Sequence, residues 1–203
     1  MSFVPDNFFS PTSSVRELHL RSSNLVSLSD YSLAPLSSSL LLLDLSDNLL
    51  TSLPPALASL TNLTHLDLSH NLIAHLDPDI LLHLPSILHL DLSRNTLHQS
   101  HNLSITDLRS SLTSLSLAGN SLTRFPLIFQ QNFPRLELLD LSNNKIAAVP
   151  NSFMRRTPRL SKLIMDNNQL ETLMVEVNIL IKGNCLKLLS DVIKDDTLRS
   201  SPS

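Results

Sequence analysis

Hydrophobic residues recur along the chain at unequal steps. The stretch LTHLDLSHNLI has apolar side chains at Leu63, Leu66, Leu68 and Ile73, which are 3, 2 and 5 residues apart. A helix would favour steps of three and four, and a strand would favour steps of two. The polar Asn71 also interrupts the apolar series. We therefore expect a short strand around Leu66 and Leu68, with bends before and after it that turn Leu63 and Ile73 inward.

The same pattern occurs seven times. Its copies read L-x-x-L-x-L-x-x-N-x-L, with swaps such as Val15 and Met165, and only the first copy lacks the asparagine, having Ser23 there. The copies start at Val15, Leu40, Leu63, Ile87, Leu112, Leu136 and Leu160, at spacings of 25, 23, 24, 25, 24 and 24 residues. Self-similarity at a fixed period of about 20–50 residues is typical of stacked repeat architectures.

This motif resembles that of the leucine-rich repeat family, over residues 15–183. The resemblance implies an α/β solenoid, a horseshoe or arc with a concave parallel β-sheet and convex segments that are short helical, 3₁₀ or extended. The expected organisation is a flexible or partial N-terminal cap at 1–14, seven repeats at 15–183, a helical C-terminal cap at 184–199 and a disordered tail at 200–203. The cap helix is predicted from the apolar spacing of Leu186, Leu189, Val192 and Ile193.

Stacking explains why each repeat needs its leucines and its asparagine. One repeat cannot cover its own apolar face, whereas neighbours about 4.8 Å apart in a strand ladder can. An asparagine where the chain leaves the strand can satisfy backbone groups that the turn would otherwise bury unpaired. We expect a structural ladder made of Asn48, Asn71, Asn95, Asn120, Asn144 and Asn168.

The second half of each repeat carries prolines and a further apolar position. Scattered prolines disfavour long helices, which predicts short turns and extended segments on the convex side. Phe129 and Phe153 fall at the same phase of consecutive repeats, and Leu57 and Ile80 occupy that phase earlier. These residues are expected to stack into a second apolar spine. The phenylalanines and the period resemble the subclass common in extracellular members of the family.

The outward strand positions vary between repeats and form the candidate site. Asp44, Asp67 and Asp91 should lie on adjacent strands, where like charges raise one another's pKa and attract a basic or hydrogen-bond-donating partner. The alternative is that the recurring D-L-S places each aspartate against the loop that follows it. The predicted partner-binding residues on the concave face are Asp44, His65, Asp67, His89, Asp91, Arg94, Leu138, Asp140 and Lys162.

Several apolar residues also occupy outward positions, where polar residues were expected. They are Leu41, Leu42, Leu88, Leu138 and Ile164. Clustered exposed apolar groups often mark a binding surface, in which they would act as buried anchors with the charged columns as a rim. Alternatively, they rest against flanking side chains or the terminal segments.

No pattern in the sequence indicates an enzyme, a cofactor or a metal site. The chain has neither a G-x-S-x-G elbow nor a glycine-rich phosphate loop, and its only glycines are Gly119 and Gly183. His65-x-Asp67 and His89-x-Asp91 repeat one spacing. However, side chains on a flat, solvated sheet rarely converge on one ion, so metal binding is not expected.

Composition limits the kinds of partner and the cellular compartment that the sequence favours. A formal net charge of −3 is too weak to indicate nucleic acid or an anionic membrane as the partner. No apolar run is long enough to cross a bilayer. The single cysteine and the absence of a signal-peptide pattern favour a cytoplasmic protein. If the N-terminus is incomplete, the chain would instead be extracellular, and the sequons at Asn62 and Asn102 could then carry glycans.

These observations predict a non-enzymatic protein–protein interaction module. It would act as an adaptor or scaffold in signalling, as a monomer that binds a basic protein partner through the concave face. The alternative is a fragment of an extracellular leucine-rich repeat receptor or matrix protein that recognises a ligand.

Overall fold

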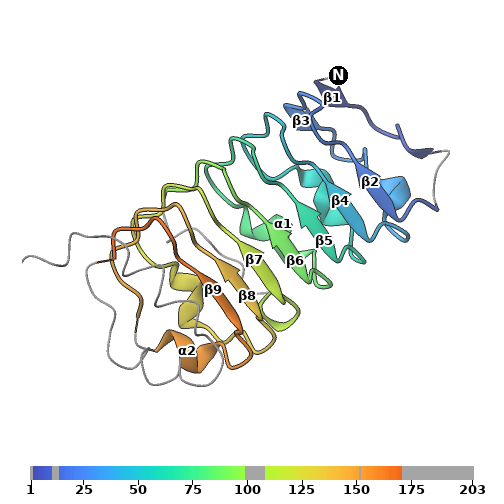
Figure 1. Ribbon diagram of the computed structural model, residues 1–203. Coiled ribbons are helices and arrows are strands. Elements are labelled where there is room, and N and C mark those ends of the chain that lie inside the picture. The colour runs from blue at the N-terminus through green and yellow to red at the C-terminus, as the bar shows by residue number, and fades with distance from the viewer. Residues whose placement is uncertain (1, 11–13, 99–107, 151, 171–203) are drawn as a thin grey trace, which may run out of the picture.

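The chain winds into a stack of coils, each of which adds one strand to a parallel sheet (Figure 1). The computed structural model describes residues 2–10, 14–98, 108–150 and 152–170. The sheet has seven strands in the order β2-β4-β5-β6-β7-β8-β9. Their bounds are β2 Glu17–His19, β4 Leu42–Asp44, β5 His65–Asp67, β6 His89–Asp91, β7 Ser114–Ser116, β8 Leu138–Asp140 and β9 Lys162–Ile164. The predicted solenoid is therefore confirmed.

The register of the sheet keeps each motif position beside its counterpart in the next coil. Leu43 lies opposite Leu66, and Leu66 lies opposite Leu90. Because the side chains of a strand alternate between its two faces, these leucines share the inner face. In the column two residues further on, five leucines are at most 1% exposed: Leu45, Leu68, Leu92, Leu117 and Leu141. The fixed period thus produces a continuous apolar wall.

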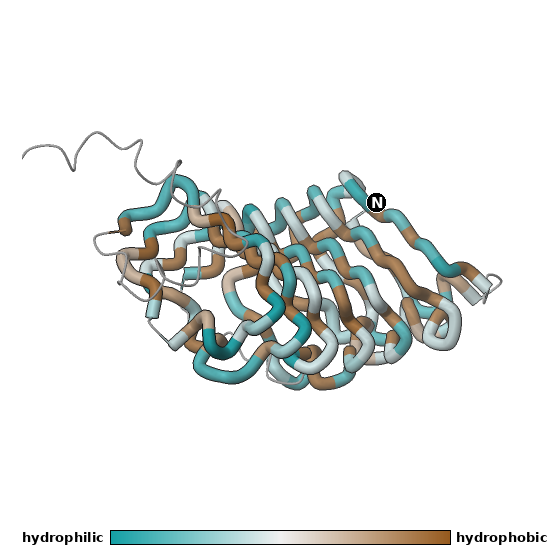
Figure 2. The backbone as a smooth tube through the Cα atoms, turned by 60° about the horizontal axis from the view of Figure 1, so that its bottom comes forward, coloured by the Kyte–Doolittle hydropathy of each residue, from teal (hydrophilic) through white to brown (hydrophobic). Residues whose placement is uncertain are grey.

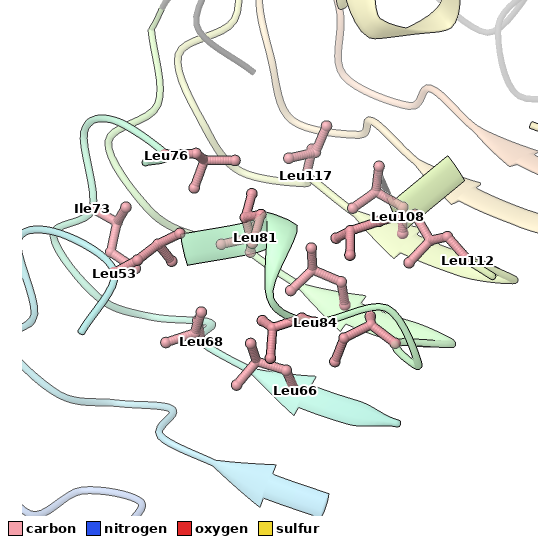
Figure 3. Close-up of a cluster of buried hydrophobic side chains, with 14 of the residues drawn as sticks. Leu53, Leu66, Leu68, Ile73, Leu76, Leu81, Leu84, Leu108, Leu112 and Leu117 are labelled. Carbon is pink, nitrogen blue, oxygen red and sulfur yellow. The ribbon is translucent and has the colours of Figure 1, made fainter. Parts of the chain in front are cut away.

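The core lies between this wall and the returning segments. Figure 2 shows hydrophobic residues recurring at equivalent places of successive coils. In Figure 3, Leu66 and Leu68 from the strand side face the same buried cluster as Leu81 and Leu84 from the helical side. Burial of leucines such as these contributes about 1.5–3 kcal/mol each.

The convex segments are short, as the prolines predicted. They comprise η2 Ala34–Leu36, η3 Pro55–Ser59, α1 Pro78–Leu82, η5 Leu108–Ser110, η6 Leu127–Gln130 and α2 Phe153–Arg156. Helix α1 begins at Pro78, which needs no partner for its missing N–H, and the Asp77 carboxylate accepts a hydrogen bond from the Asp79 N–H at 2.9 Å. Compact turns of this kind let consecutive coils lie close together on the convex side.

The second apolar spine forms at the predicted phase. The rings of Phe129 and Phe153 lie with their centroids 5.2 Å apart, and Phe125 contacts Phe153 at 4.7 Å. Leu57 and Ile80 are buried at the same phase of earlier coils. Edge-to-face aromatic contacts add about 0.5–1.5 kcal/mol beyond the buried area.

The asparagines connect each coil to the preceding one. The Asn71 amide donates to the carbonyls of Leu68 in its own coil at 3.1 Å and of Leu45 in the preceding coil at 3.0 Å. Its Oδ1 accepts from the Leu50 N–H at 3.0 Å. The same arrangement recurs at Asn48, Asn95, Asn120, Asn144 and Asn168. Each of these side chains therefore replaces backbone hydrogen bonds that the turn leaves unmade.

The first coil shows why Ser23 is tolerated at the asparagine phase. The Oδ1 atom of Asn48 accepts from the N–H groups of Ser23 at 3.0 Å and Leu25 at 2.9 Å. The turn of the first coil is thus satisfied by the asparagine of the second coil. A side-chain amide at position 23 is not needed to complete this turn.

A two-stranded sheet joins the N-terminal segment to the first coil. Strand β1, Phe3–Val4, pairs in parallel with β3, Ser27–Leu28, and Val4 is only 2% exposed. Phe3 and Phe8 are about half exposed. The proposed C-terminal cap at 184–199 and tail at 200–203 lie outside the described residues, so those boundaries stay predictions. In the described ranges, no helix has the length and apolar character needed to cross a membrane.

Candidate functional site

The outward strand positions form two columns across the concave face. The strand register places these columns side by side. The first column contains Glu17, Leu42, His65, His89, Ser114, Leu138 and Lys162, and the second contains His19, Asp44, Asp67, Asp91, Ser116, Asp140 and Ile164. Eight of the nine predicted partner-binding residues belong to these columns, and Arg94 lies in the turn after β6. Their role in binding remains a prediction.

Each aspartate of the second column also closes the turn that follows its strand. Asp67 Oδ1 accepts from the Ser69 N–H at 2.8 Å, and Asp91 Oδ1 accepts from the Ser93 N–H at 2.8 Å. Asp44 and Asp140 make the equivalent bonds at 2.9 Å to Ser46 and Ser142. The structural interpretation of D-L-S therefore applies, and it accounts for one oxygen of each carboxylate. The second oxygen can accept a hydrogen bond from a partner.

The carboxylates differ in how easily they ionise. Burial raises the pKa of Asp67, and the charges of Asp91 and Asp44 raise it further against the hydrogen bonds from Ser69. Burial also acts to raise the pKa of Asp44, but hydrogen bonds from Ser46 and His19 outweigh it and leave the pKa below its usual 3.8. The prediction that neighbouring aspartates raise one another's pKa is thus wrong for Asp44, because its local donors stabilise the charged form.

Two imidazoles stack in the first column. The rings of His65 and His89 have centroids 4.4 Å apart and an angle of 21° between their planes. Thr64 Oγ1 lies 2.9 Å from His65 Nδ1. Burial lowers the pKa of His89, and the charge that His65 can carry lowers it further, while Glu137 opposes both. The two rings are thus stacked face to face. The described residues contain no group of three or more histidine, cysteine or acidic residues that could hold a metal.

Two hollows meet on the concave face. One has a volume of about 320 Å³ and is lined by residues that include Leu42, His65, Asp67 and His89. The other has a volume of about 610 Å³ and extends over the turns that follow β6–β8. Asp91 and Ser116 line both hollows. The resulting surface offers carboxylates, imidazoles and apolar side chains to an incoming ligand.

A left-handed turn, which sequence reasoning missed, positions Arg94. The residue before each asparagine has a positive φ, of 53° at Arg94 and 63° at Gly119. A Cβ added to Gly119 would lie 3.0 Å from Arg94 Cγ, so the absence of a side chain leaves room for Arg94 over the next coil. The other residues with this backbone at this phase are Ser22, Asp47, His70, Asn143 and Asn167. Gly119 and the two asparagines were the available sequence signal.

The apolar outward residues differ in exposure. Leu41 is 39% exposed. Leu42, Leu88, Leu138 and Ile164 are half-buried. The half-buried leucines beside the charged column keep part of their apolar surface exposed. A partner could cover this surface, as partners cover the anchor residues of other interfaces.

Comparison with known proteins identifies the family. The family model described as leucine rich repeat matches residues 13–73, 38–97, 61–122 and 110–170. The chain belongs to the leucine-rich repeat family. Leucine-rich repeat domains generally bind proteins and typically have no catalytic activity. A search of curated proteins found no match.

Solved structures share the leucine-rich repeat fold. An LRR protein of Leptospira interrogans is 29% identical with a TM-score of 0.69, and the match covers 87% of this chain and 49% of that one. The crystal structure of a TLR13–ssRNA13 complex is 30% identical with a TM-score of 0.73, covering 84% of this chain and 24% of TLR13. The chain therefore spans about half of the first relative and about a quarter of the second.

Proposed function

We propose that this leucine-rich repeat domain is an adaptor that binds a basic protein partner through the acidic part of its concave face. The observation that supports this most directly is which of the described carboxylates already have an ion-pair partner and which do not. In the described part of the chain, the ion pairs involve Asp44 or Asp47, and none involves Asp67 or Asp91. Asp67 and Asp91 are neighbours on β5 and β6 and offer their second oxygens to a cationic side chain.

The surroundings of these carboxylates suit a protein interface. Leu42 provides apolar area beside them, and the stacked His65 and His89 rings provide flat surface. Interfaces place apolar and aromatic anchors at the centre and polar groups at the rim. A specific complex of ordinary size would bury about 1,200–2,000 Å² in total, which the concave columns of several coils could supply.

The comparison with TLR13 raises an RNA ligand as a second possibility, because TLR13 was crystallised in complex with ssRNA13. The concave face of this chain carries Asp44, Asp67, Asp91 and Asp140, and a row of carboxylates repels a phosphate backbone. A basic protein is therefore the better match for the concave face, and we propose no RNA site there.

An extracellular receptor or matrix fragment remains the alternative context. The Phe129–Phe153 contact and the near-constant period are typical of extracellular members. Asn62 is exposed on the turn before β5, and its amide donates to the Ser38 carbonyl at 3.1 Å. Secretory expression followed by glycopeptide mass spectrometry tests this context. A glycan at Asn62 would support it, and an unmodified Asn62 would oppose it.

Affinity purification with quantitative mass spectrometry tests the proposed function. The variant Asp67→Asn with Asp91→Asn removes two charges but keeps an oxygen that can accept from Ser69 and Ser93. The matched control, Asp30→Asn with Asp79→Asn, removes two exposed charges away from the concave columns. We expect a basic partner to be recovered with wild type and control and lost with the concave variant. Equal recovery with all three would contradict the concave site.

A further inference from the structure

Charge is segregated along the solenoid. Residues 2–98 contain three basic and nine acidic side chains, a formal charge of −6, whereas residues 108–170 contain eight basic and three acidic ones, a formal charge of +5. The weak overall charge of −3 therefore conceals two halves of opposite sign. The proposed concave site uses the acidic half and leaves the basic half without a role.

Four arginines gather where two consecutive coils turn from the convex side into strands β8 and β9. We call this set, Arg135, Arg155, Arg156 and Arg159, the arginine corner. The Phe133 N–H donates to the Arg156 carbonyl at 2.7 Å, which brings the segment before β8 against the end of α2. Arg135 and Arg159 each follow a proline and occupy the same phase of neighbouring coils.

In the other coils, the residue at this position of the repeat is small and uncharged. The equivalent residues there are Ser14, Ser39, Asn62, Ser86 and Ser111. The repeat fold therefore does not require an arginine at this position, since five coils form without one. A cation at the end of a helix can stabilise the last carbonyls, which applies to Arg155 and Arg156 in α2 but not to Arg135 or Arg159.

Two of the four guanidinium groups, those of Arg135 and Arg159, form no ion pair with another described residue. Both of these residues are exposed. The Nε atom of the half-buried Arg156 has no hydrogen-bond partner among the described residues. A buried donor without a protein partner is uncommon in native structures, where ordered water or an ion often completes such a group.

We propose that the arginine corner binds a phosphoserine or phosphothreonine in an acidic segment of a partner protein. A guanidinium presents a planar fork of donors that matches phosphate oxygens in pairs. A phosphorylated side chain carries a charge of about −1.5 to −2 and three acceptor oxygens, which suits several neighbouring arginines better than one carboxylate does. This site is separate from the proposed concave site.

The surroundings favour a phosphorylated protein over a nucleic acid. Proteins that bind single strands use a basic track along the backbone and aromatic side chains on which bases stack. The arginine phase extends over two coils only, and the aromatic residues closest to it in the sequence, Phe133 and Phe153, are at most 1% exposed. One phosphate with acidic neighbours fits this short cluster, whereas a polymer would need a longer one.

Fluorescence anisotropy with the full chain tests this proposal. The probe is a fluorescein-labelled peptide with one phosphoserine between aspartates, and its unphosphorylated twin and a short oligothymidine serve as comparisons. We expect the phosphopeptide to bind and the twin to bind about tenfold more weakly or not at all. The variant Arg135→Gln with Arg159→Gln should lower the affinity for the phosphopeptide by about tenfold or more.

Two further variants make the result specific to the corner. Arg124→Gln with Lys145→Gln removes two exposed charges from the same basic half but away from the turns that enter the strands, and should leave the affinity within about twofold. Asp67→Asn with Asp91→Asn should also bind the phosphopeptide normally, which separates this proposal from the concave one. The arginine and lysine variants should show the wild-type circular dichroism melt, and the aspartate variant should be folded at the temperature of the assay.

Three results would overturn the phosphopeptide proposal. The first is equal binding of the phosphorylated and unphosphorylated peptides, including no binding of either. The second is an affinity that does not change in the corner variant. The third is oligothymidine that binds more tightly than the phosphopeptide and loses affinity in the corner variant, which would assign the corner to nucleic acid.

Discussion

The two halves of the concave sheet share one inner face and differ on the outer one. Strands β4, β5 and β6 read LLD, HLD and HLD, and strands β7, β8 and β9 read SLS, LLD and KLI. The central residue is a buried leucine in all six. Stacking restricts the inner position to one shape, while the outer positions face solvent and are free to differ. The contrast separates residues that make the fold from residues that can select a partner.

Truncating an inner leucine should lower the free energy of unfolding by a similar amount in both halves of the concave sheet. Leu66→Ala in β5 and Leu139→Ala in β8 remove side chains that are 2% and 0% exposed. Each should lower the free energy of unfolding by about 2–5 kcal/mol, because a cavity remains where the side chain was. Urea denaturation followed by circular dichroism measures both. A difference above about 2 kcal/mol would show that the inner faces are not equivalent.

The asparagine ladder should contribute less at its last described member. Asn71→Ala leaves buried partners in two coils unpaired and should cost about 2–4 kcal/mol. Asn168 is only half-buried, so Asn168→Ala should cost about 1 kcal/mol. The same urea titrations give both values. Equal losses would mean that the burial of these amides does not control their contribution.

Neutralising two neighbouring aspartates should shift stability in opposite directions. The pKa of Asp44 is lowered in the fold, so its carboxylate stabilises the protein above pH 3.8 and this contribution disappears as the pH falls through its folded pKa. The pKa of Asp67 is raised, so stability falls as the pH rises from 3.8 through the folded pKa, where the folded carboxyl group ionises less readily than the unfolded one. At neutral pH, Asp44→Asn should lower Tm and Asp67→Asn should raise it, each by a few degrees at most.

The pH dependence of these two variants is the check. Their difference in Tm should shrink in two steps as the pH is lowered. The effect of Asp67 disappears as the pH falls to 3.8, because its raised pKa protonates it above that pH, and the effect of Asp44 disappears below 3.8. Differential scanning calorimetry over this range measures it. Shifts of the same sign at neutral pH would contradict the assignment of separate environments to Asp44 and Asp67.

The histidine stack should give the smallest effect. Because the folded-state pKa of His89 is lowered, the unfolded chain binds the proton more readily, and stability falls as the pH drops from the usual 6.5 through the folded pKa. In His89→Gln this small acid-side loss of Tm should diminish. No change between wild type and variant would show that neither burial nor the charge of His65 disfavours protonation of His89.

The buried half of the motif was predictable because burial ties residue type to position. Leu45, Leu68 and Leu92 could be aligned from their phase alone, and they form one column. The left-handed turn was harder to predict, because Asp47, His70 and Arg94 share a backbone conformation without sharing any side-chain chemistry. Only Gly119 and neighbouring asparagines indicated it.

The outer face was predictable in placement but not in electrostatics. The repeat spacing predicted that Asp67 and Asp91 would lie on neighbouring strands, and the two-residue alternation within each strand predicted that both would face the concave side. It could not show that Ser46 and His19 would hold the pKa of Asp44 down, because those bonds depend on the three-dimensional turn. The arginine corner escaped prediction for a similar reason, since its members come from two coils and the overall net charge hides them.

Hydrogen–deuterium exchange of the chain with its recovered partner tests most directly whether the acidic half of the concave face is the binding surface. Partner binding should slow exchange in peptides that cover β4, β5 and β6 and leave peptides of β9 and α2 unchanged. Protection confined to β9, α2 or other convex segments, with β5 and β6 exchanging as in the free chain, would contradict it.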